Sequence, residues 1–329
     1  MNRKQVLNKA FQRGHLLSTK NNLYKNWIDK FIVDEIKGDV GDKGDITSDS
    51  VLKNGKKVKA LVYSRSDGIV AGIEEVCWLL RKNKVKVKEL KKDGRRIVKG
   101  SELLMLEGNE KNILRLERSV LDILSRMSGI ATLTNDLTMH KVGIAPTRKT
   151  QWRYLDKKAV YVGGGLTHRL ALWESILIKD NHLSALKKEQ KNQTVFPTSK
   201  SNDFEEKVSD VIEVALERAW KKRKKGIFVE IEVTNGSDAI KAAQKFKELQ
   251  SKNNNTPCLI MLDNLSGRSM KNIIRKLKIK KLYNHVLIEA SGGITPKKIK
   301  EYSKSGVDVI SLGYLTTSSQ SLNIKLRVM

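Results

Sequence analysis

Short apolar runs alternate with amphipathic helical sequence from about residue 140 onward, and this rhythm restricts the fold more than any other pattern in the chain. Continuous apolar strands that alternate with helices are typical of a parallel sheet whose two faces are both covered. Seven such runs favour an α/β barrel, with an open doubly wound sheet as the alternative on strand number alone. The runs are VGIA, AVYV, SILI, GIFVEIEV, CLIML, VLIEA and DVISL.

The part of the chain before this alternation has a different texture. Residues 1–30 are predicted to form a polar helical lead-in. Residues 31–130 combine short alternating runs with Gly turns and predict a small α+β sandwich domain, with helices at 73–82 and 113–127. Residues 131–329 are then the α/β-barrel domain, and the polar stretch 187–203 within it reads as a surface insertion. A length of 329 residues fits about two domains.

The charge balance is strongly basic, with 64 Lys and Arg against 36 Asp and Glu and a net charge of +28. Such a surplus indicates nucleic acid, an anionic surface or anionic small molecules as partners. Most of it is Lys spread along every segment, with the densest runs at 221–225 and 271–281. Aromatic residues do not interleave with these runs as they do in a stacking surface for nucleic acid. A solvated Lys-rich surface is the favoured interpretation, and RNA contact is the alternative.

The cysteines and the lengths of the apolar runs predict a soluble cytoplasmic protein. Cys77 and Cys258 both lie in apolar runs, which is typical of buried thiols in a reducing compartment. The five His and two Cys lack metal-ligand spacing. The apolar run near the N-terminus is too short for a signal peptide, and no run approaches the roughly 18 apolar residues of a membrane span.

Polar residues follow successive strand-like runs, at the point where each run ends. The carboxyl ends of barrel strands converge on one face, so these residues are expected to assemble a site there. One set is cationic, and its natural partners are carboxylates and phosphates, to which an Arg side chain can donate two parallel hydrogen bonds. The members of this cationic set are Arg148, Lys149, His168, Arg169 and Lys179.

Anionic and glycine-rich groups complete the predicted site. Glu232 and Asp263 suit ribose hydroxyls, a Mg²⁺ ion or a developing positive charge. Ser291, Gly292 and Gly293, followed by a Pro and helical sequence, suit a phosphate cradle at a helix N-terminus, and Gly313 is placed to complete it. A sugar phosphate and metal beside a ligand with carboxylates indicate phosphoribosyl transfer to an aromatic acid.

The same residues lie in motifs that resemble, in order, those of the quinolinate phosphoribosyltransferase family. The resemblance covers about residues 31 to 318. Its barrel motifs are TRKT, GGGLTHR, IKDNH, EIEV, MLDN, EASGGI and GVDVISLG, and its earlier motifs are GDKGDIT, SDGIVAG, LER and RMSGIAT. The resemblance implies that quinolinate and phosphoribosyl pyrophosphate become nicotinate mononucleotide, pyrophosphate and carbon dioxide, in de novo NAD biosynthesis.

The resemblance also implies a role for each site residue. Lys149, Glu232 and Asp263 would be catalytic and would handle phosphoribosyl pyrophosphate with the Mg²⁺ that this substrate carries, with no structural metal. Arg118 would reach quinolinate from the other subunit of a homodimer. The remaining quinolinate residues would be Arg148, His168, Arg169 and Lys179, and the 5′-phosphate residues would be Ser291, Gly292, Gly293 and Gly313.

The sequence differs from the family pattern at two positions near the expected site, and three other functions remain as alternatives. Gln151 to Arg153 follow Thr150 where the family usually has a Pro-Gly turn, which affects the expected shape of the acceptor pocket. Asp122 stands where Asn is usual. The rivals are a paralogue of the molybdate-transport-associated type with another acceptor, a nicotinate phosphoribosyltransferase, and a non-catalytic RNA-binding derivative. Retained Lys149, Glu232 and Asp263 argue against the last, so nucleic acid is not expected as a partner.

Overall fold

The computed structural model describes residues 2–53, 55–194, 210–250 and 256–329. The chain forms two compact units. The first unit consists of Met1–Gln12, His140–Ala145 and His168–Leu312, and the second of Arg13–Met139, Pro146–Thr167 and Gly313–Met329. The division of the sequence into 1–30, 31–130 and 131–329 stays a prediction.

The first unit is built on a six-stranded sheet with the strand order β6-β11-β10-β9-β8-β7. Neighbouring strands from β7 to β11 pair in parallel. The central strands are buried almost throughout, as their unbroken apolar sequence predicts. The strands are β6 (Gly143–Pro146), β7 (Ile176–Ile178), β8 (Val229–Val233), β9 (Cys258–Asp263), β10 (Leu287–Ser291) and β11 (Val309–Leu312).

The predicted mixed α/β class is confirmed, but one of the seven predicted strands was wrong. The run AVYV lies in helix α6 (Tyr154–Val162), so the described residues contribute six strands to the parallel sheet. Leu155, Ala159 and Val160 are buried on this helix. A run of four apolar residues fits a buried helix as well as a strand, so its periodicity alone did not separate the two.

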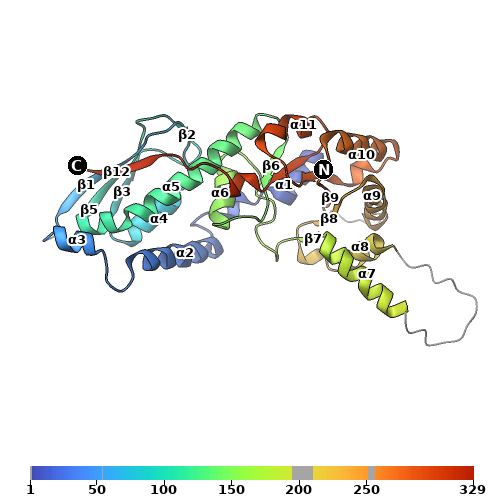
Figure 1. Ribbon diagram of the computed structural model, residues 1–329, viewed down its shortest axis with the longest axis horizontal. Coiled ribbons are helices and arrows are strands. Elements are labelled where there is room, and N and C mark those ends of the chain that lie inside the picture. The colour runs from blue at the N-terminus through green and yellow to red at the C-terminus, as the bar shows by residue number, and fades with distance from the viewer. Residues whose placement is uncertain (1, 54, 195–209, 251–255) are drawn as a thin grey trace, which may run out of the picture. The chain divides into compact units, whose positions relative to one another are not determined.

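Helices cover the parallel sheet, and α7, α8, α9 and α10 pack against one another in chain order (Figure 1). Helix α10 buries Met270, Ile273, Ile274 and Leu277 on one stripe and exposes Lys and Arg on the other. Helix α7 extends to Thr194, so the start of the predicted insertion 187–203 is helical, and the rest of it lies outside the described residues. The helices are α7 (Asp180–Thr194), α8 (Val211–Lys221), α9 (Gly236–Gln250), α10 (Gly267–Ile279) and α11 (Ile299–Ser303).

The N-terminal helix α1 (Arg3–Phe11) also belongs to the first unit. Asn2 caps it by accepting a hydrogen bond from the Gln5 main chain. The Arg3 side chain donates to Asp308 Oδ1 at 2.8 Å and to the Tyr283 carbonyl at 2.7 Å, which connects the start of the helix to the segments before β11 and β10. At its other end Phe11 is fully buried.

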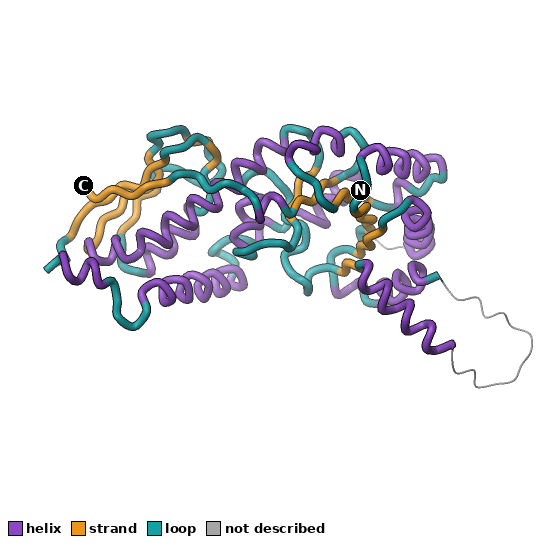
Figure 2. Tube along the Cα trace, viewed as in Figure 1, coloured by secondary structure: helices purple, strands orange, loops and turns teal. Residues whose placement is uncertain are grey.

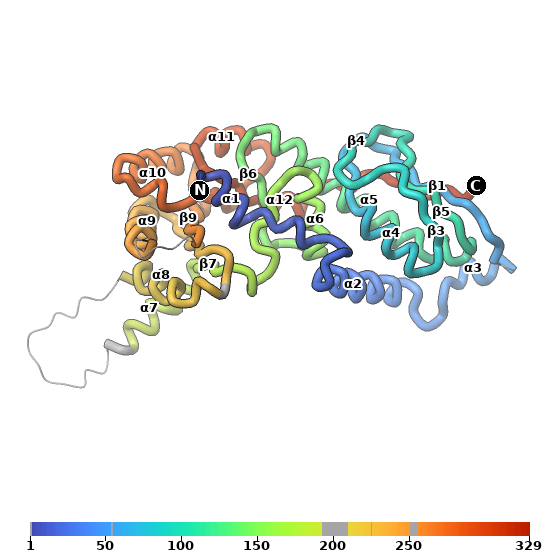
Figure 3. Tube along the Cα trace, turned by 180° about the vertical axis from the view of Figure 1, so that it is seen from behind, coloured from blue at the N-terminus to red at the C-terminus, as the bar shows by residue number. Residues whose placement is uncertain are grey.

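The second unit contains an antiparallel sheet with the order β12-β1-β5-β3, against which α4 and α5 pack (Figures 2 and 3). The helix predicted at 73–82 is confirmed, and the helix predicted at 113–127 is longer than expected. Strand β12, at the C-terminus, pairs with β1 from Ala60 opposite Val328 to Ser64 opposite Ile324. The main elements are α2 (Asn22–Val40), α3 (Ile46–Val51), β1 (Lys57–Ser64), α4 (Ile73–Lys82), β3 (Lys86–Glu89), β5 (Glu102–Asn109), α5 (Glu110–Thr138), α12 (Tyr314–Thr317) and β12 (Ile324–Val328).

Strands β2 (Gly68–Ile69) and β4 (Arg96–Ile97) form a two-stranded antiparallel ribbon. The remaining described elements are four short 3₁₀ helices: η1 (Gly14–Leu16), η2 (Arg223–Lys225), η3 (Tyr283–His285) and η4 (Pro296–Lys298), the last of which leads into α11. Within the described ranges, no helix is both long enough and apolar enough to cross a membrane.

Candidate active site

The ends of β9 and β10 bring the predicted acidic and glycine-rich residues together. Ser291 is registered opposite Asp263, and the Asn264 main chain donates to the Ser291 carbonyl at 3.0 Å. Gly292 has a φ of +91°, and a Cβ placed there would lie 2.5 Å from the Asn264 nitrogen. Only glycine fits this turn, because both the left-handed backbone and the close approach exclude a side chain. This tight glycine turn follows Ser291, which lies beside Asp263 in the sheet.

The ends of β7 and β8 carry a pair of opposite charges. Lys179 Nζ lies 3.3 Å from Glu232 Oε2, and the lysine is about half exposed while the glutamate is mostly covered. Burial raises the pKa of Glu232, the Lys179 charge lowers it, and the Asp263 charge raises it again, with a net rise. The Asp263 carboxylate at the end of β9 is therefore close enough to the end of β8 to raise the pKa of Glu232.

Arg169 is a buried cation in the loop before β7. Its side chain donates from Nη1 to the Ser175 carbonyl at 2.9 Å, and only 5% of the residue is exposed. Its main-chain N–H donates to Nδ1 of the neighbouring His168 at 2.6 Å. Contacts within its own loop thus help to position Arg169, and its charge also lowers the pKa of the Glu230 carboxyl on β8.

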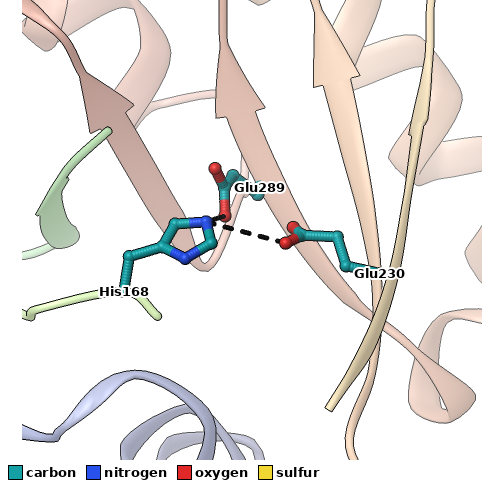
Figure 4. A group of neighbouring side chains, drawn as sticks. All are labelled: His168, Glu230 and Glu289. Carbon is teal, nitrogen blue, oxygen red and sulfur yellow. Dashed lines mark ion pairs between the residues drawn. The ribbon is translucent and has the colours of Figure 1, made fainter. Parts of the chain in front are cut away.

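His168 lies with its ring edge toward two carboxylates (Figure 4). Its Nε2 is 3.4 Å from Glu289 Oε2 and 3.6 Å from Glu230 Oε2. The ring stacks on Phe11 with centroids 4.3 Å apart and meets Phe228 edge-on at 5.7 Å. The imidazole is therefore packed in the interior of the first unit, with one polar edge toward acidic groups.

The residue-by-residue prediction missed Glu230 and Glu289. Both are fully buried, on β8 and β10, and each precedes a predicted site residue by two positions on the same strand face. Burial and then the charge of Glu289 raise the pKa of Glu230 well above its ordinary value. A signal was available in the sequence, because a carboxylate inside an apolar strand run is unusual. Sequence spacing did not show that the two would meet.

The second unit holds the other predicted residues. Thr316 Oγ1 donates to the Lys149 carbonyl at 2.6 Å, and a Cβ added to Gly313 would contact the Lys149 side chain and Thr147 at 3.5 Å. Lys149 and Gly313 are therefore neighbours. Arg148 is exposed in the same loop.

Arg118 lies on α5 in the second unit, with Nη1 3.4 Å from Asp122 Oδ1, and both side chains are more than half exposed. Asp122, the residue that departs from the family pattern, thus lies beside a predicted quinolinate residue. The roles of Arg118 and of the other site residues stay predictions.

Two family models match the chain. The N-terminal domain of quinolinate phosphoribosyl transferase matches residues 45–128, and its C-terminal domain matches residues 130–327. The chain belongs to the quinolinate phosphoribosyltransferase family. The resemblance inferred from the motifs is therefore confirmed.

Individual relatives agree with this membership. A probable carboxylating nicotinate-nucleotide pyrophosphorylase of Methanothermobacter thermautotrophicus is 33% identical over 303 residues, which is 89% of this chain and 96% of that protein. A protein of the same description from Archaeoglobus fulgidus is 35% identical over 283 residues, 83% of this chain and 95% of its own.

Solved structures of nicotinate-nucleotide pyrophosphorylases share the fold of this family member. The enzyme from Ehrlichia chaffeensis has a TM-score of 0.72 at 30% identity, covering 92% of this chain and 98% of that one. The human nicotinic acid phosphoribosyltransferase has a TM-score of 0.56 at 14% identity, covering 91% of this chain and 73% of that one. The human enzyme therefore shares the fold alone.

Proposed function

We propose that this family member is a decarboxylating quinolinate phosphoribosyltransferase of de novo NAD biosynthesis. It joins quinolinate to phosphoribosyl pyrophosphate and releases nicotinate mononucleotide, pyrophosphate and carbon dioxide. The observation that carries the proposal is the cluster at the ends of β7 to β10, where a lysine, two carboxylates and a glycine turn lie together. Its relatives of similar length carry the same activity in their names.

The acceptor is held by cations. Arg169 and Lys179 bind the quinolinate carboxylates, assisted by Arg148 and His168, and Arg118 comes from the second subunit of a homodimer. Charge-assisted hydrogen bonds of this kind are roughly twice as strong as neutral ones, and Arg offers two in parallel. Two carboxylates on the acceptor account for more cations than nicotinate, with one carboxylate, requires.

The donor is held by the acidic and glycine-rich groups. As in the family resemblance, Ser291, Gly292, Gly293 and Gly313 are assigned to its 5′-phosphate, and Lys149 is assigned to the same substrate. The pyrophosphate arrives as its Mg²⁺ complex, part of the substrate, near Glu232 and Asp263. The partly exposed carboxylate oxygens of these two residues suit a hard cation.

Bond exchange then needs no nucleophile from the protein. The ring nitrogen of quinolinate attacks the anomeric carbon as the bond to pyrophosphate breaks, and Glu232 and Asp263 stabilise the positive charge that develops there. The nitrogen becomes a pyridinium, which accepts the electron pair of the breaking carbon–carbon bond as the C2 carboxylate leaves as carbon dioxide. A proton then takes its place on the ring carbon. Positioning supplies much of the rate.

The two buried free thiols, Cys77 and Cys258, support a reducing cytoplasm as the compartment. Burial raises the pKa of each thiol to about 12, so neither is a reactive thiolate at neutral pH.

The test is an assay with purified protein, phosphoribosyl pyrophosphate, Mg²⁺ and quinolinate labelled in its C2 carboxylate. We expect labelled carbon dioxide and mononucleotide in equal amounts, and poor use of nicotinate. A variant with Glu232→Gln and Asp263→Asn, which preserves shape but removes both charges, is the inactive control. Turnover of nicotinate equal to that of quinolinate would contradict the proposal and favour a paralogue with another acceptor.

A further inference from the structure

The loop 147–153, between β6 and α6, carries Arg148, assigned to quinolinate, and Lys149, assigned to phosphoribosyl pyrophosphate. Both side chains are exposed, so the points from which they start depend on the main chain of the loop. At its end Arg153 has a φ of +46°, a left-handed conformation that is unfavourable for a residue with a side chain. Such a backbone persists only where its surroundings hold it. Contacts from other segments of the second unit therefore have to hold this loop.

The Asp156 carboxylate, in the first turn of α6, holds the end of the loop. The residue is fully buried, and its Oδ2 accepts hydrogen bonds from the main-chain N–H groups of Gln151 and Trp152, both at 3.2 Å. Hydrogen bonds from N–H groups to a carboxylate are stronger than those to a neutral acceptor. One buried oxygen therefore fixes the two peptide groups that lie just before the strained Arg153.

Arg126, on α5, holds the Asp156 carboxylate and connects it to a further contact of the loop. Its Nε donates to Asp156 Oδ1 at 2.8 Å and its Nη2 to Oδ2 at 2.9 Å, which is the parallel geometry that arginine forms with a carboxylate. The same Nη2 donates to the Thr316 carbonyl at 2.9 Å. The guanidinium carbon also lies 5.3 Å from the centre of the Trp152 ring, within the range of a cation–π contact. One arginine therefore contacts the carboxylate, the loop and the Thr316 main chain.

The Thr316 hydroxyl holds the middle of the loop, at Lys149 itself. Thr316 lies on α12 with 1% of the residue exposed, and its Oγ1 donates to the Lys149 carbonyl at 2.6 Å. The Gly313 carbonyl is farther from this hydroxyl, at 3.2 Å, and a hydroxyl has one hydrogen to donate, so the bond to Lys149 is the stronger contact. The Lys149 N–H donates to Thr147 Oγ1 at 3.2 Å. The main chain of Lys149 is thus held at both its carbonyl and its N–H.

These contacts form a closed ring within the second unit. The ring leads from Arg126 through Asp156 to the loop, and from the loop through the Thr316 hydroxyl and carbonyl back to Arg126. We infer that Arg126, Asp156 and Thr316 are positioning residues for Lys149: they hold the loop main chain in one conformation and so place the lysine for phosphoribosyl pyrophosphate. This inference rests on the proposed function only in taking Lys149 as a ligand of that substrate.

A buried ion pair that only stabilises the fold is the competing interpretation of Arg126 and Asp156. Loss of such a pair lowers the Tm and leaves the affinity of the folded protein for its ligands unchanged. The first unit contains a pair of the same geometry for comparison. Arg3 donates to both oxygens of Asp308, and Asp308 Oδ2 also accepts from the Ile288 main-chain N–H at 2.7 Å. That pair holds the amino ends of β10 and β11 rather than a loop with a predicted substrate residue.

The first experiment measures the loop without any substrate, by hydrogen–deuterium exchange and mass spectrometry of peptides that span residues 147–153. Asp156→Asn replaces one carboxylate oxygen with an NH₂ donor, which then faces the donors of Arg126 or those of the loop. We expect the two amides bonded to Asp156 to exchange at least about threefold faster in this variant and at an unchanged rate in Asp308→Asn. Equal exchange in Asp156→Asn and the unaltered protein would overturn the inference, as would an equal increase in both variants.

The second experiment measures the binding of phosphoribosyl pyrophosphate with Mg²⁺ by calorimetry, at a temperature where each variant is folded. Asp156→Asn should raise the Kd about tenfold, the loss expected when one charged group is no longer placed to bond. Asp308→Asn should lower the Tm and leave the Kd within about twofold. An unchanged Kd in Asp156→Asn, or an equal increase in both variants, would overturn the inference. If the unaltered protein binds no phosphoribosyl pyrophosphate, the proposed function fails, while the exchange result still decides whether Asp156 holds the loop.

A milder variant tests the same inference if Asp156→Asn does not fold. Thr316→Val has a similar shape but no hydroxyl, so it should raise the Kd of phosphoribosyl pyrophosphate about two- to tenfold, whereas Thr316→Ser keeps the hydroxyl and should stay within about twofold. Thr134→Val is the matched control, because Thr134 is a fully buried threonine of the second unit whose hydroxyl donates to the Ile130 carbonyl at 2.8 Å. It should lower stability without changing the Kd. An unchanged Kd in Thr316→Val, a Thr316→Ser variant as weak as Thr316→Val, or an equal loss of affinity in Thr134→Val would overturn the inference.

Discussion

Lys179 Nζ lies 3.3 Å from Glu232 Oε2, so that the cation following β7 and the carboxylate at the end of β8 face each other across two paired strands. The lysine lowers the pKa of a glutamate whose pKa burial raises. In the proposed reaction this pairing favours the ionised form of Glu232, while Lys179, which is about half exposed, remains accessible to a carboxylate of the acceptor. One contact therefore connects the binding of the two substrates.

Lys179→Met should shift the pH dependence of catalysis. Without the lysine charge the pKa of Glu232 rises further, and the ionised form that stabilises the anomeric centre is reached only at higher pH. The acidic limb of kcat/KM for phosphoribosyl pyrophosphate should therefore move to higher pH, and KM for quinolinate should increase. Lys188→Met, at an exposed position of helix α7, which begins directly after Lys179, is the control. An acidic limb that stays in place in Lys179→Met would exclude Glu232 as the group that titrates.

Arg169→Ala and Asp263→Asn should separate the two halves of the site. Loss of the arginine's charged bonds, at about 1.5–3 kcal/mol, should weaken quinolinate binding about ten- to a hundredfold and leave phosphoribosyl pyrophosphate nearly unaffected. Asp263→Asn is almost isosteric, so it should weaken the Mg²⁺–pyrophosphate substrate and slow the chemical step while sparing quinolinate. Titration of each variant with each ligand decides this. The reverse pattern would exchange the assigned roles.

Inactive Arg118→Ala and inactive Lys149→Ala proteins should recover part of the activity when mixed. In the proposed homodimer Arg118 serves the neighbouring site and Lys149 its own, so a hybrid dimer contains one intact site. The measurement is activity after mixing under conditions of subunit exchange, followed by sizing of the complex. The control is each variant taken alone through the same exchange. No recovery in exchanged dimers would place both residues in the same subunit's site.

Gly292→Ala and Gly38→Ala should change stability in opposite directions. At Gly292 the φ of +91° and the 2.5 Å approach to the Asn264 nitrogen leave no room for a methyl group. We expect a lower Tm and weaker binding of phosphoribosyl pyrophosphate. Gly38 lies inside helix α2 with nothing within 4 Å of an added Cβ, and Ala there should stabilise by up to about 1 kcal/mol. Thermal melts of both variants provide the comparison. An unchanged Tm for Gly292→Ala would exclude the tight turn.

Local order was predictable from the sequence. The sequence predicted the helix at 73–82 and seven apolar strand runs, and the helix and six of the strands are confirmed, because side-chain burial leaves an apolar pattern along a helix or strand. The polar residues at strand ends were also recognisable, since parallel strands place such residues at one edge of a sheet. AVYV was the exception, as a short apolar run satisfies a buried helix and a strand equally well.

Contacts between distant parts of the chain required the tertiary structure. Phe11, His168 and Glu289 are far apart in sequence, and no periodic pattern connects a helix near the N-terminus with carboxylates on β8 and β10. The same holds for β12, which returns from the C-terminus to pair with β1. The sequence by itself determined the secondary elements, the family and the chemical types at the site. Which residues meet was decided by the packing of those elements, since sheet register and side-chain fit depend on all of them together.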